Sequence, residues 1–182
     1  QPETKVIYVE SPSNPLLRVV DLAAIGRLGR ERGVLTVADN TFATPINQNP
    51  LALGLDAVIH SATKYLNGHS DIIAGAVAGT SALIDEVTRL MRLWGPSIDP
   101  HAAWLTERGL KTLALRVERQ HRNALAIAQW AASRPEFSAV HHPGLVSHPD
   151  HELATRLFQG YGGMVGLVLE GGVAATQRFL SH

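Results

Sequence analysis

One lysine stands just beyond a short apolar run, with two hydroxyl side chains close before it. The lysine is Lys64, and the hydroxyls belong to Ser61 and Thr63. Upstream, the apolar run 34–38 ends at Asp39. Pyridoxal phosphate requires an amine that forms a Schiff base, a carboxylate that faces its pyridinium nitrogen, and donors for its phosphate. These groups, at the ends of two neighbouring apolar runs, predict a pyridoxal-phosphate site.

Lys64 is the residue that we expect to carry the chemistry. A neutral amine is the nucleophile in imine formation, and burial among apolar side chains favours that form. Once released from the cofactor, the same amine can move protons between Cα and the neighbouring carbons. The alternative is an ordinary surface lysine after a strand, and the flanking hydroxyls favour the catalytic interpretation.

Asp39 is expected to face the ring nitrogen of the cofactor. A carboxylate there keeps the nitrogen protonated, so that the ring accepts electrons from Cα. Asp-Asn-Thr is also common turn chemistry, which makes a capping role the alternative. Ligands of open α/β sheets bind beyond the carboxyl ends of strands, and Asp39 stands at such an end. Thr41, its neighbour, is a weaker candidate.

Ser61 and Thr63 are the expected phosphate donors. Two hydroxyls placed two positions apart on an extended segment can both reach one phosphate, which needs several short hydrogen bonds. Capping of the following turn is the alternative for either residue taken alone.

The residues around the lysine carry a resemblance to a known family. The run 56–71 resembles the lysine site of the Cys/Met-metabolism family of pyridoxal-phosphate enzymes, through Asp56, the core Ser61-Ala-Thr-Lys-Tyr65 and the tail Gly68-His-Ser70. Its members include cystathionine γ-synthase, cystathionine β- and γ-lyases, methionine γ-lyase and O-acetylhomoserine sulfhydrylase. Three further stretches are similar to the family in the same order: 10–15, 108–113 and 142–149.

This resemblance implies an enzyme that performs elimination or replacement at Cβ or Cγ of a sulfur amino acid, as cystathionine γ-synthase or a cystathionine lyase does. O-acetylhomoserine sulfhydrylase and methionine γ-lyase activities stay open, as does another class of the same cofactor fold, such as an aminotransferase or decarboxylase. The resemblance also implies that Asn14 lies near the ring hydroxyl of the cofactor, although Asn-Pro is equally a turn dipeptide.

The resemblance further implies partners. They are an amino-acid substrate and other copies of the chain, assembled as a dimer of dimers. Against the family, the chain resembles about half a subunit, without the ring-stacking aromatic residue and the arginine that binds the substrate carboxylate. A catalytically incompetent fragment is therefore a further alternative.

Composition limits the other partners. The chain has 182 residues, of which 16 are basic and 16 acidic, and 45% are hydrophobic. Without a basic stripe, no nucleic acid or membrane surface is expected as a partner. Without cysteine, disulfides, thiolate zinc sites and cysteine nucleophiles are excluded. No apolar run is long enough to span a bilayer and no signal peptide opens the chain, so we expect a cytoplasmic protein.

The histidines are expected to be structural. Four of them cluster between 141 and 151, where His148 and His151 have a spacing that suits one edge of a metal site. No acidic residue stands at a matching spacing, and prolines make the stretch a loop, so we expect no metal there. His60 and His69, on either side of the lysine turn, are also interpreted as structural.

The spacing of apolar residues predicts an α/β fold. Strands are expected at 5–9, 34–38, 57–59 and 72–78. A helix between the first two would be capped by Asp21 and ended by Gly33. Buried strands that alternate with a helix are typical of a mostly parallel sheet. By resemblance, this is the large domain of a fold-type I pyridoxal-phosphate enzyme.

The second half of the chain is more helical. A helix capped by Ser81 and a long helix over 101–133 are expected, the latter as a spine between two domains. Strands at 138–140 and 164–169, with a helix at 152–159, predict the start of a smaller α/β domain. We therefore assign 1–112 to the cofactor-binding domain, and 113–182 to a linking helix and a truncated C-terminal domain.

Overall fold

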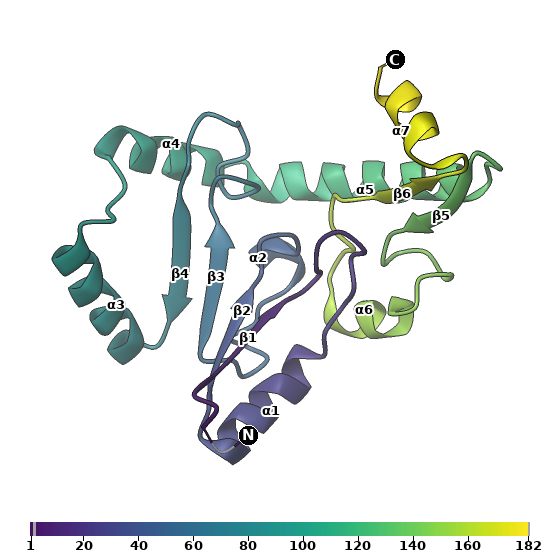
Figure 1. Cartoon of the computed structure of the whole chain (residues 1–182). Helices are drawn as coiled ribbons and strands as arrows, with labels where there is room; N and C mark the ends of the chain where they lie inside the picture. Colours follow the sequence, from purple (N-terminus) through teal and green to yellow (C-terminus); the bar gives the residue numbers. More distant parts are fainter. Residues whose placement is uncertain (2, 182) are drawn as a thin grey trace.

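The computed structural model describes residues 1 and 3–181, which form two sheets bridged by a long helix (Figure 1). The larger sheet contains β1 (Val6–Glu10), β2 (Leu35–Asp39), β3 (Ala57–Ser61) and β4 (Gly75–Gly79), hydrogen bonded in that order. The first three strands are parallel, and β4 is antiparallel to β3. The prediction of an α/β fold with a mostly parallel sheet is confirmed.

Three strands end at the same edge of this sheet. Glu10 is in register with Asp39, and Asp39 is in register with Ile59. β3 continues to Ser61, shortly before Lys64. The parallel order therefore brings Asp39 and the lysine turn to one edge, as the sequence predicted.

Asp56 fixes the position of β3 beside β2 at the opposite edge. Its Oδ2 accepts hydrogen bonds from Thr36 N at 2.8 Å and from Thr36 Oγ1 at 2.7 Å. Asp56 N donates in return to Thr36 O at 3.1 Å. A slip of one residue would turn every side chain of a strand to the other face. Asp56 thus helps to decide which residues of β3 reach the edge where Lys64 stands.

Helix α1 (Leu22–Arg32) packs against β2 and keeps the predicted ends. The Asp21 carboxylate caps its first turn by accepting from Ala24 N at 2.9 Å, and Gly33 ends it in a left-handed conformation with φ 61°. Leu22, Ala38 and Leu55 form a buried cluster between the helix and the sheet. This cluster supports the strand that presents Asp39.

Gly29 lets α1 approach β2 closely. A Cβ at this position would lie 2.3 Å from Thr36 Cγ2 and 2.9 Å from Val34 O. In an isolated helix, Gly→Ala stabilises by up to about 1 kcal/mol. Here we expect Gly29→Ala to lower the free energy of unfolding by about 1–3 kcal/mol, because the added methyl overpacks the interface. Urea unfolding measures this change.

Thr36→Ser supplies the matched control for that prediction. It removes the Thr36 methyl but keeps the hydroxyl that donates to Asp56. The double variant Gly29→Ala/Thr36→Ser should recover part of the stability that Gly29→Ala loses. A Gly29→Ala protein that is more stable than the unchanged one would contradict the packing argument.

The remaining elements follow in chain order: α2 (Thr44–Asn47), α3 (Ser81–Trp94), α4 (Pro100–Leu110), α5 (Leu113–Ala132), β5 (Phe137–His141), α6 (His151–Leu157), β6 (Gly166–Leu169) and α7 (Gly172–Leu180). β5 and β6 pair antiparallel and form the second sheet. The predicted cap of α3 was wrong by one residue, because Thr80, and not Ser81, accepts the capping hydrogen bond.

The single long helix predicted for 101–133 was also wrong. The structure has two helices, α4 and α5, separated at Lys111 and Thr112. Thr112 N and Thr112 Oγ1 both donate to Gly109 O at 3.3 Å, which replaces the usual i→i−4 bond by a tighter turn. No proline marks the break, so the helical pattern alone did not reveal it.

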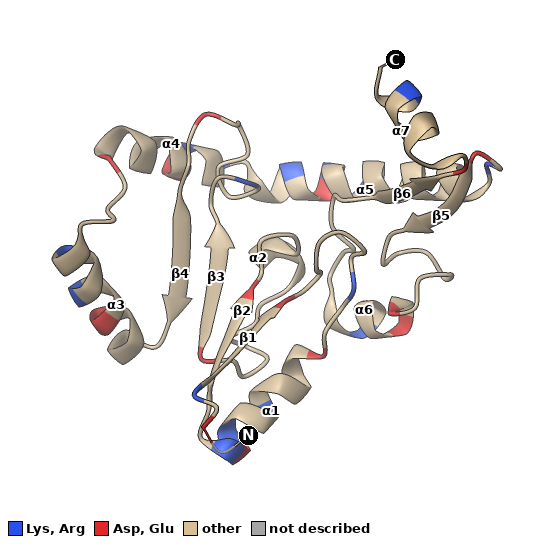
Figure 2. Cartoon of the chain, in the orientation of Figure 1, with Lys and Arg blue, Asp and Glu red and all other residues tan. Residues whose placement is uncertain are grey.

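The two halves of the chain pack against each other. Val19, Ala43, Ala154 and Phe158 form one buried cluster, which joins α6 to the segments around β1 and α2. Basic and acidic residues are distributed over most elements (Figure 2). Among the described residues, no helix combines the length and the apolar character that a membrane crossing requires.

Candidate functional site

An open cavity of about 830 Å³ lies at the edge where the parallel strands end. All five residues predicted from the sequence line it: Asn14, Asp39, Ser61, Thr63 and Lys64. Its volume falls within the range of roughly 300–1,000 Å³ that is common for small-molecule sites. The fold thus brings the predicted residues together, while their individual roles stay predictions.

The carboxylate of Asp39 is held on both of its oxygens. Oδ1 accepts from Thr41 N at 3.0 Å, and Oδ2 accepts from Tyr8 Oη at 3.2 Å. Burial and the nearby negative charge of Asp39 raise the pKa of Tyr8, so its hydroxyl stays a donor. Asp39 is half-buried and borders the cavity, and these two hydrogen bonds fix the orientation of its carboxylate.

Thr41 connects the ends of β2 and β3. Its side chain is buried, and its Oγ1 accepts a hydrogen bond from Ser61 N at 2.8 Å. Thr41, the weaker candidate of the sequence, also lines the cavity. Its contacts tie Asp39 to the segment that carries Ser61 and Lys64.

The two hydroxyls proposed for phosphate are not equivalent. Thr63 Oγ1 accepts from Ala74 N at 2.9 Å and lies 3.2 Å from Ala74 O, to which it donates. Among the described residues, the hydroxyl of Ser61 makes no such bond. Ser61 is therefore the freer donor, and Thr63 must turn its proton away from Ala74 to donate into the cavity.

Lys64 sits in a tight turn after β3. Lys64 N donates to Ser61 O at 3.1 Å, and Gly68 N donates to Lys64 O at 2.7 Å. The Lys64 side chain is exposed rather than buried among apolar side chains. The cavity opens to solvent on this side, where the lining residue Ile73 is 91% exposed.

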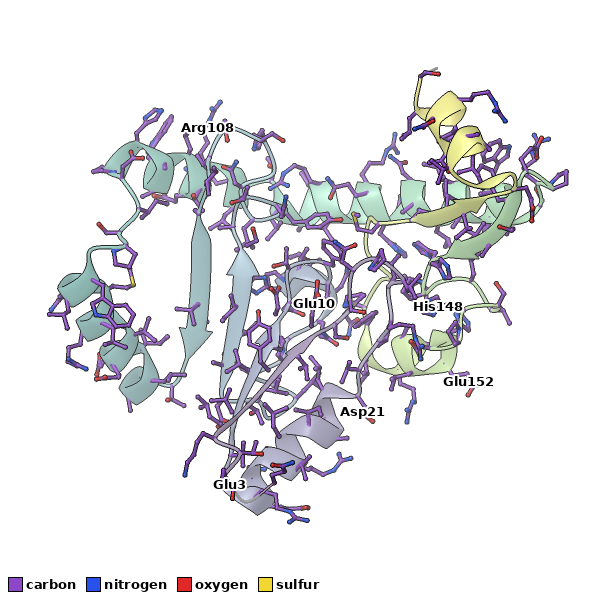
Figure 3. The ribbon with its side chains drawn as sticks, in the orientation of Figure 1. Glu3, Glu10, Asp21, Arg108, His148 and Glu152 are labelled. Atoms are coloured by element: carbon purple, nitrogen blue, oxygen red, sulfur yellow. The ribbon has the colours of Figure 1, made fainter. Side chains whose placement is uncertain are left out.

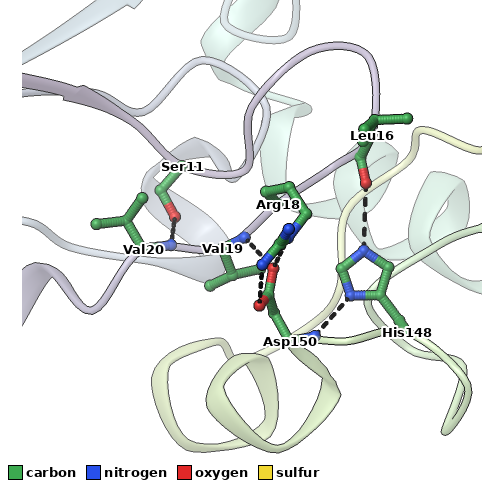
Figure 4. A network of polar contacts seen from close by, with 7 residues as sticks. All are labelled: Ser11, Leu16, Arg18, Val19, Val20, His148 and Asp150. Carbon is green, nitrogen blue, oxygen red and sulfur yellow. Dashed lines mark hydrogen bonds and ion pairs between the residues drawn. The ribbon is translucent and has the colours of Figure 1, made fainter.

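Asn14 lies on the loop between β1 and α1, and its side chain is exposed. The loop is fixed at its base, where Ser11 Oγ accepts from Val20 N at 3.1 Å. Farther along, His148 accepts from Asp150 N through Nδ1 and donates through Nε2 to Leu16 O at 3.2 Å (Figure 4). A residue distant in sequence therefore holds the segment that presents Asn14.

An ion pair completes this attachment. Arg18 donates from Nε to Asp150 Oδ2 at 2.6 Å and from Nη2 to Oδ1 at 3.0 Å. Val19 N also donates to Oδ2 at 2.9 Å (Figure 4). The hydrogen bond from Arg18, before all other causes, lowers the pKa of Asp150. The network therefore depends on the charged form of this carboxylate.

A lowered pKa of Asp150 in the folded state predicts how stability depends on pH. The stabilisation is fully present above the unfolded pKa of about 3.9 and is lost as pH falls through the lower folded value. Asp150→Asn should lower the free energy of unfolding at neutral pH. It should also reduce the loss of stability that the unchanged protein shows as the pH falls into the acid range. The effect should be on the order of 1 kcal/mol, because the Arg18 side chain is 55% exposed and solvent screens the pair.

Melting temperatures across a pH series test this expectation. Glu152→Gln is the matched control, because Glu152 is an exposed acidic residue in the first turn of α6, the helix that follows Asp150 (Figure 3). If both variants melt alike at every pH, the Arg18–Asp150 pair does not hold the loop.

Several lining residues were not found from the sequence. Glu10, at the end of β1, could have been noticed because it ends an apolar strand as Asp39 does (Figure 3). Gln120 on α5 and Met164 before β6 come from the second half of the chain, and no local motif marks them. Gln120 Oε1 is buried without a hydrogen-bond partner among the described residues.

The histidines contact backbone groups. His151 Nδ1 lies 2.9 Å from Pro143 O, and His69 Nδ1 lies 2.7 Å from Asn67 O. Burial lowers the pKa of His142 to about 4, and burial also lowers the pKa of His60. Within the described part of the chain, no three His, Asp or Glu side chains are placed to hold a metal.

Comparison with known proteins agrees with this geometry. The family model "Cys/Met metabolism PLP-dependent enzyme" matches residues 1–182. The chain is 48% identical to a cystathionine beta-lyase of Coxiella burnetii, over 99% of this chain and 47% of that protein. It is 44% identical to cystathionine gamma-synthase 1, chloroplastic, of Arabidopsis thaliana, over 98% of this chain and 32% of that protein.

Among solved structures, cystathionine gamma synthase from Xanthomonas oryzae pv. oryzae, in complex with aminoacrylate and cysteine, superposes with a TM-score of 0.94 at 43% identity. That match covers 96% of this chain and 46% of the other. The chain thus spans 32–47% of the length of the relatives named here. Its whole length matches one family model and its cavity gathers the predicted side chains, so the chain belongs to the Cys/Met metabolism family of PLP-dependent enzymes.

Proposed function

We propose that the cavity holds pyridoxal phosphate and that this chain's residues divide the binding among them. The single observation that carries the proposal is that an amine, a carboxylate, two hydroxyls and an amide line one cavity. Lys64 would attach the cofactor, Asp39 would face the ring nitrogen, and Ser61 and Thr63 would donate to the phosphate. Asn14 would lie beside the ring hydroxyl. The donor set fits the chemistry of each part of the cofactor.

The proposed reaction is elimination or replacement at Cβ or Cγ of a sulfur amino acid, of the cystathionine γ-synthase or cystathionine lyase type. The cofactor supplies an electron-accepting ring that stabilises negative charge at Cα. Lys64 takes the proton from Cα and moves protons at the neighbouring carbons. Asp39, held by Tyr8 and Thr41, keeps a proton on the ring nitrogen.

Product analysis of the protein as it is naturally produced tests this proposal. Cleavage of cystathionine at the Cβ–S bond gives homocysteine, pyruvate and ammonia, whereas cleavage at Cγ–S gives cysteine, 2-oxobutyrate and ammonia. A synthase instead forms cystathionine from an activated homoserine and cysteine. Methionine γ-lyase and O-acetylhomoserine sulfhydrylase activities are the alternatives and are assayed with methionine and with sulfide. A protein that binds the cofactor but converts none of these substrates would support the alternative that the chain is catalytically incompetent.

We also propose the division at residue 112. Every strand of the larger sheet precedes α3, whereas β5 and β6 follow α5. The start of α5 at Leu113 supports the boundary. The cluster of Val19, Ala43, Ala154 and Phe158 crosses it, so we expect the two parts to unfold together.

Assembly into a dimer of dimers and a cytoplasmic location complete the proposal. Large apolar side chains on α3 and α4 support association, because Trp94 is 75% exposed and Trp104 is 55% exposed. Light scattering after size-exclusion chromatography measures the mass of the assembly. Microscopy of a fluorescent fusion tests the location.

A further inference from the structure

We propose that Arg116 is a positioning residue for Lys64, which fixes the lysine turn against the break between α4 and α5. This inference rests on the proposed function, because it gives Lys64 the role of cofactor attachment. Arg116 does not line the cavity. It acts through the backbone of the turn that follows Lys64.

The guanidinium of Arg116 joins two segments of the chain that are far apart in sequence. Nη1 donates to Tyr65 O at 2.9 Å, and Tyr65 directly follows Lys64. Nη2 donates to Gly109 O at 2.8 Å and lies 3.4 Å from Leu66 O. The planar fork of a guanidinium can serve acceptors on two sides at once, which a lysine ammonium on a flexible stem does poorly.

The break in the helix supplies one of these acceptors. Gly109 O accepts hydrogen bonds from Thr112 N and Thr112 Oγ1 at 3.3 Å. The hydrogen bond that it accepts from Arg116 Nη2 is shorter, at 2.8 Å. Arg116 Nε donates to Thr112 Oγ1 at 3.0 Å. The interruption that the helical pattern did not predict is therefore part of the binding site for the guanidinium.

Two glycines leave space for this arrangement. A Cβ on Gly68 would lie 2.0 Å from Arg116 Nη1, and a Cβ on Gly109 would lie 2.3 Å from Asn67 O. The lysine turn and α4 thus approach each other backbone to backbone, with the guanidinium beside them. A side chain at Gly109 would meet the backbone of the lysine turn, whereas a side chain at Gly68 would displace the guanidinium.

Arg116 has no acidic partner among the described residues, since the ion pairs there involve other arginines. Its charge is met by carbonyl dipoles. The same turn is packed by apolar contacts, because Ala62, Leu66, Leu113 and Val117 form one buried cluster. The backbone around Lys64 is therefore fixed from two sides, while its side chain is free to reach into the cavity.

The test compares Arg116→Met with Arg116→Lys and with the control Arg122→Met, in the protein as it is naturally produced. Arg122 lies on the same helix, is exposed and forms an ion pair with Glu118. Three quantities are measured: cofactor affinity by absorbance titration, the rate of borohydride trapping of the cofactor at Lys64 by mass spectrometry, and the melting temperature. Affinity and rate are expressed per folded molecule.

Arg116→Met should weaken cofactor binding and slow trapping by about tenfold or more, a change of about 1.4 kcal/mol for each factor of ten. Arg116→Lys should recover part of both, and Arg122→Met should match the unchanged protein. If Arg116→Met lowers only the melting temperature, its role is merely structural and the proposal is wrong. If Arg116→Met does not fold, the Arg116→Lys protein decides. Unchanged cofactor affinity and an unchanged trapping rate in Arg116→Lys would also overturn the proposal. Failure of the unchanged protein to be trapped at Lys64 would instead refute the proposed function.

Discussion

Lys64→Ala should abolish covalent attachment of the cofactor and lower turnover by at least 10²–10⁴-fold, the order of magnitude of one lost acid–base group. The loss is large because one side chain serves both as attachment point and as proton carrier. Lys64 is exposed in a cavity that also holds Asp39 and Ser61, so its removal should leave the fold unchanged. Borohydride reduction followed by peptide mass mapping, together with steady-state kinetics, measures both effects.

The chain contains three lysines, which makes the mapping decisive. Lys5 and Lys111 are exposed and do not line the cavity. Lys5→Ala and Lys111→Ala should therefore retain attachment and turnover. Near-normal turnover in the Lys64 variant, or trapping at either of the other two lysines, would refute the assigned role.

Asp39→Asn should leave cofactor binding largely intact and slow turnover by on the order of 10²–10³-fold. The substitution keeps the shape of the side chain and one acceptor oxygen but removes the charge that holds the ring nitrogen protonated. The stabilisation is lost chiefly in the transition state, so the rate falls at saturating cofactor. Tyr8→Phe, which removes only the donor to Oδ2, is the matched control and should have a small effect.

The hydroxyl pair should behave in the opposite way. Ser61→Ala and Thr63→Val remove hydrogen bonds to a charged phosphate, each worth about 1.5–3 kcal/mol, so the main loss should be affinity. Thr63→Val should also disturb the backbone at Ala74, whereas Ser61→Ala should not. Cofactor titration and turnover at saturating cofactor separate the two kinds of effect. If Asp39→Asn weakens binding but turns over normally once saturated, the role of Asp39 is wrong.

Local patterns were sufficient to predict the sheet and the residues that meet at one cavity. The end of an apolar run located Asp39, and the hydroxyls before Lys64 located the other side of the cavity. Both groups line one cavity because parallel strands bring their carboxyl ends to one edge, so sequence order translates directly into position. The cap of α1 followed for a similar reason, since Asp21 and Gly33 act on adjacent residues.

Long-range contacts explain what the sequence did not reveal. The break between α4 and α5 lies where Arg116 donates to Gly109 O and where the lysine turn approaches α4 closely. Gln120 and Met164 reach the cavity from elements that no motif connects to Lys64. Such contacts are set by packing, which neither helical period nor turn chemistry encodes.

The cavity walls have a consequence for the order of events on the ribosome. Lys64 and Met164, which border the same space, are separated by 100 positions of the chain (164 minus 64). At a synthesis rate of about 5–20 residues per second, the nascent chain carries the lysine for about 5–20 s before this wall has been made. Capture of the cofactor in the complete cavity is therefore a step that follows translation of Met164.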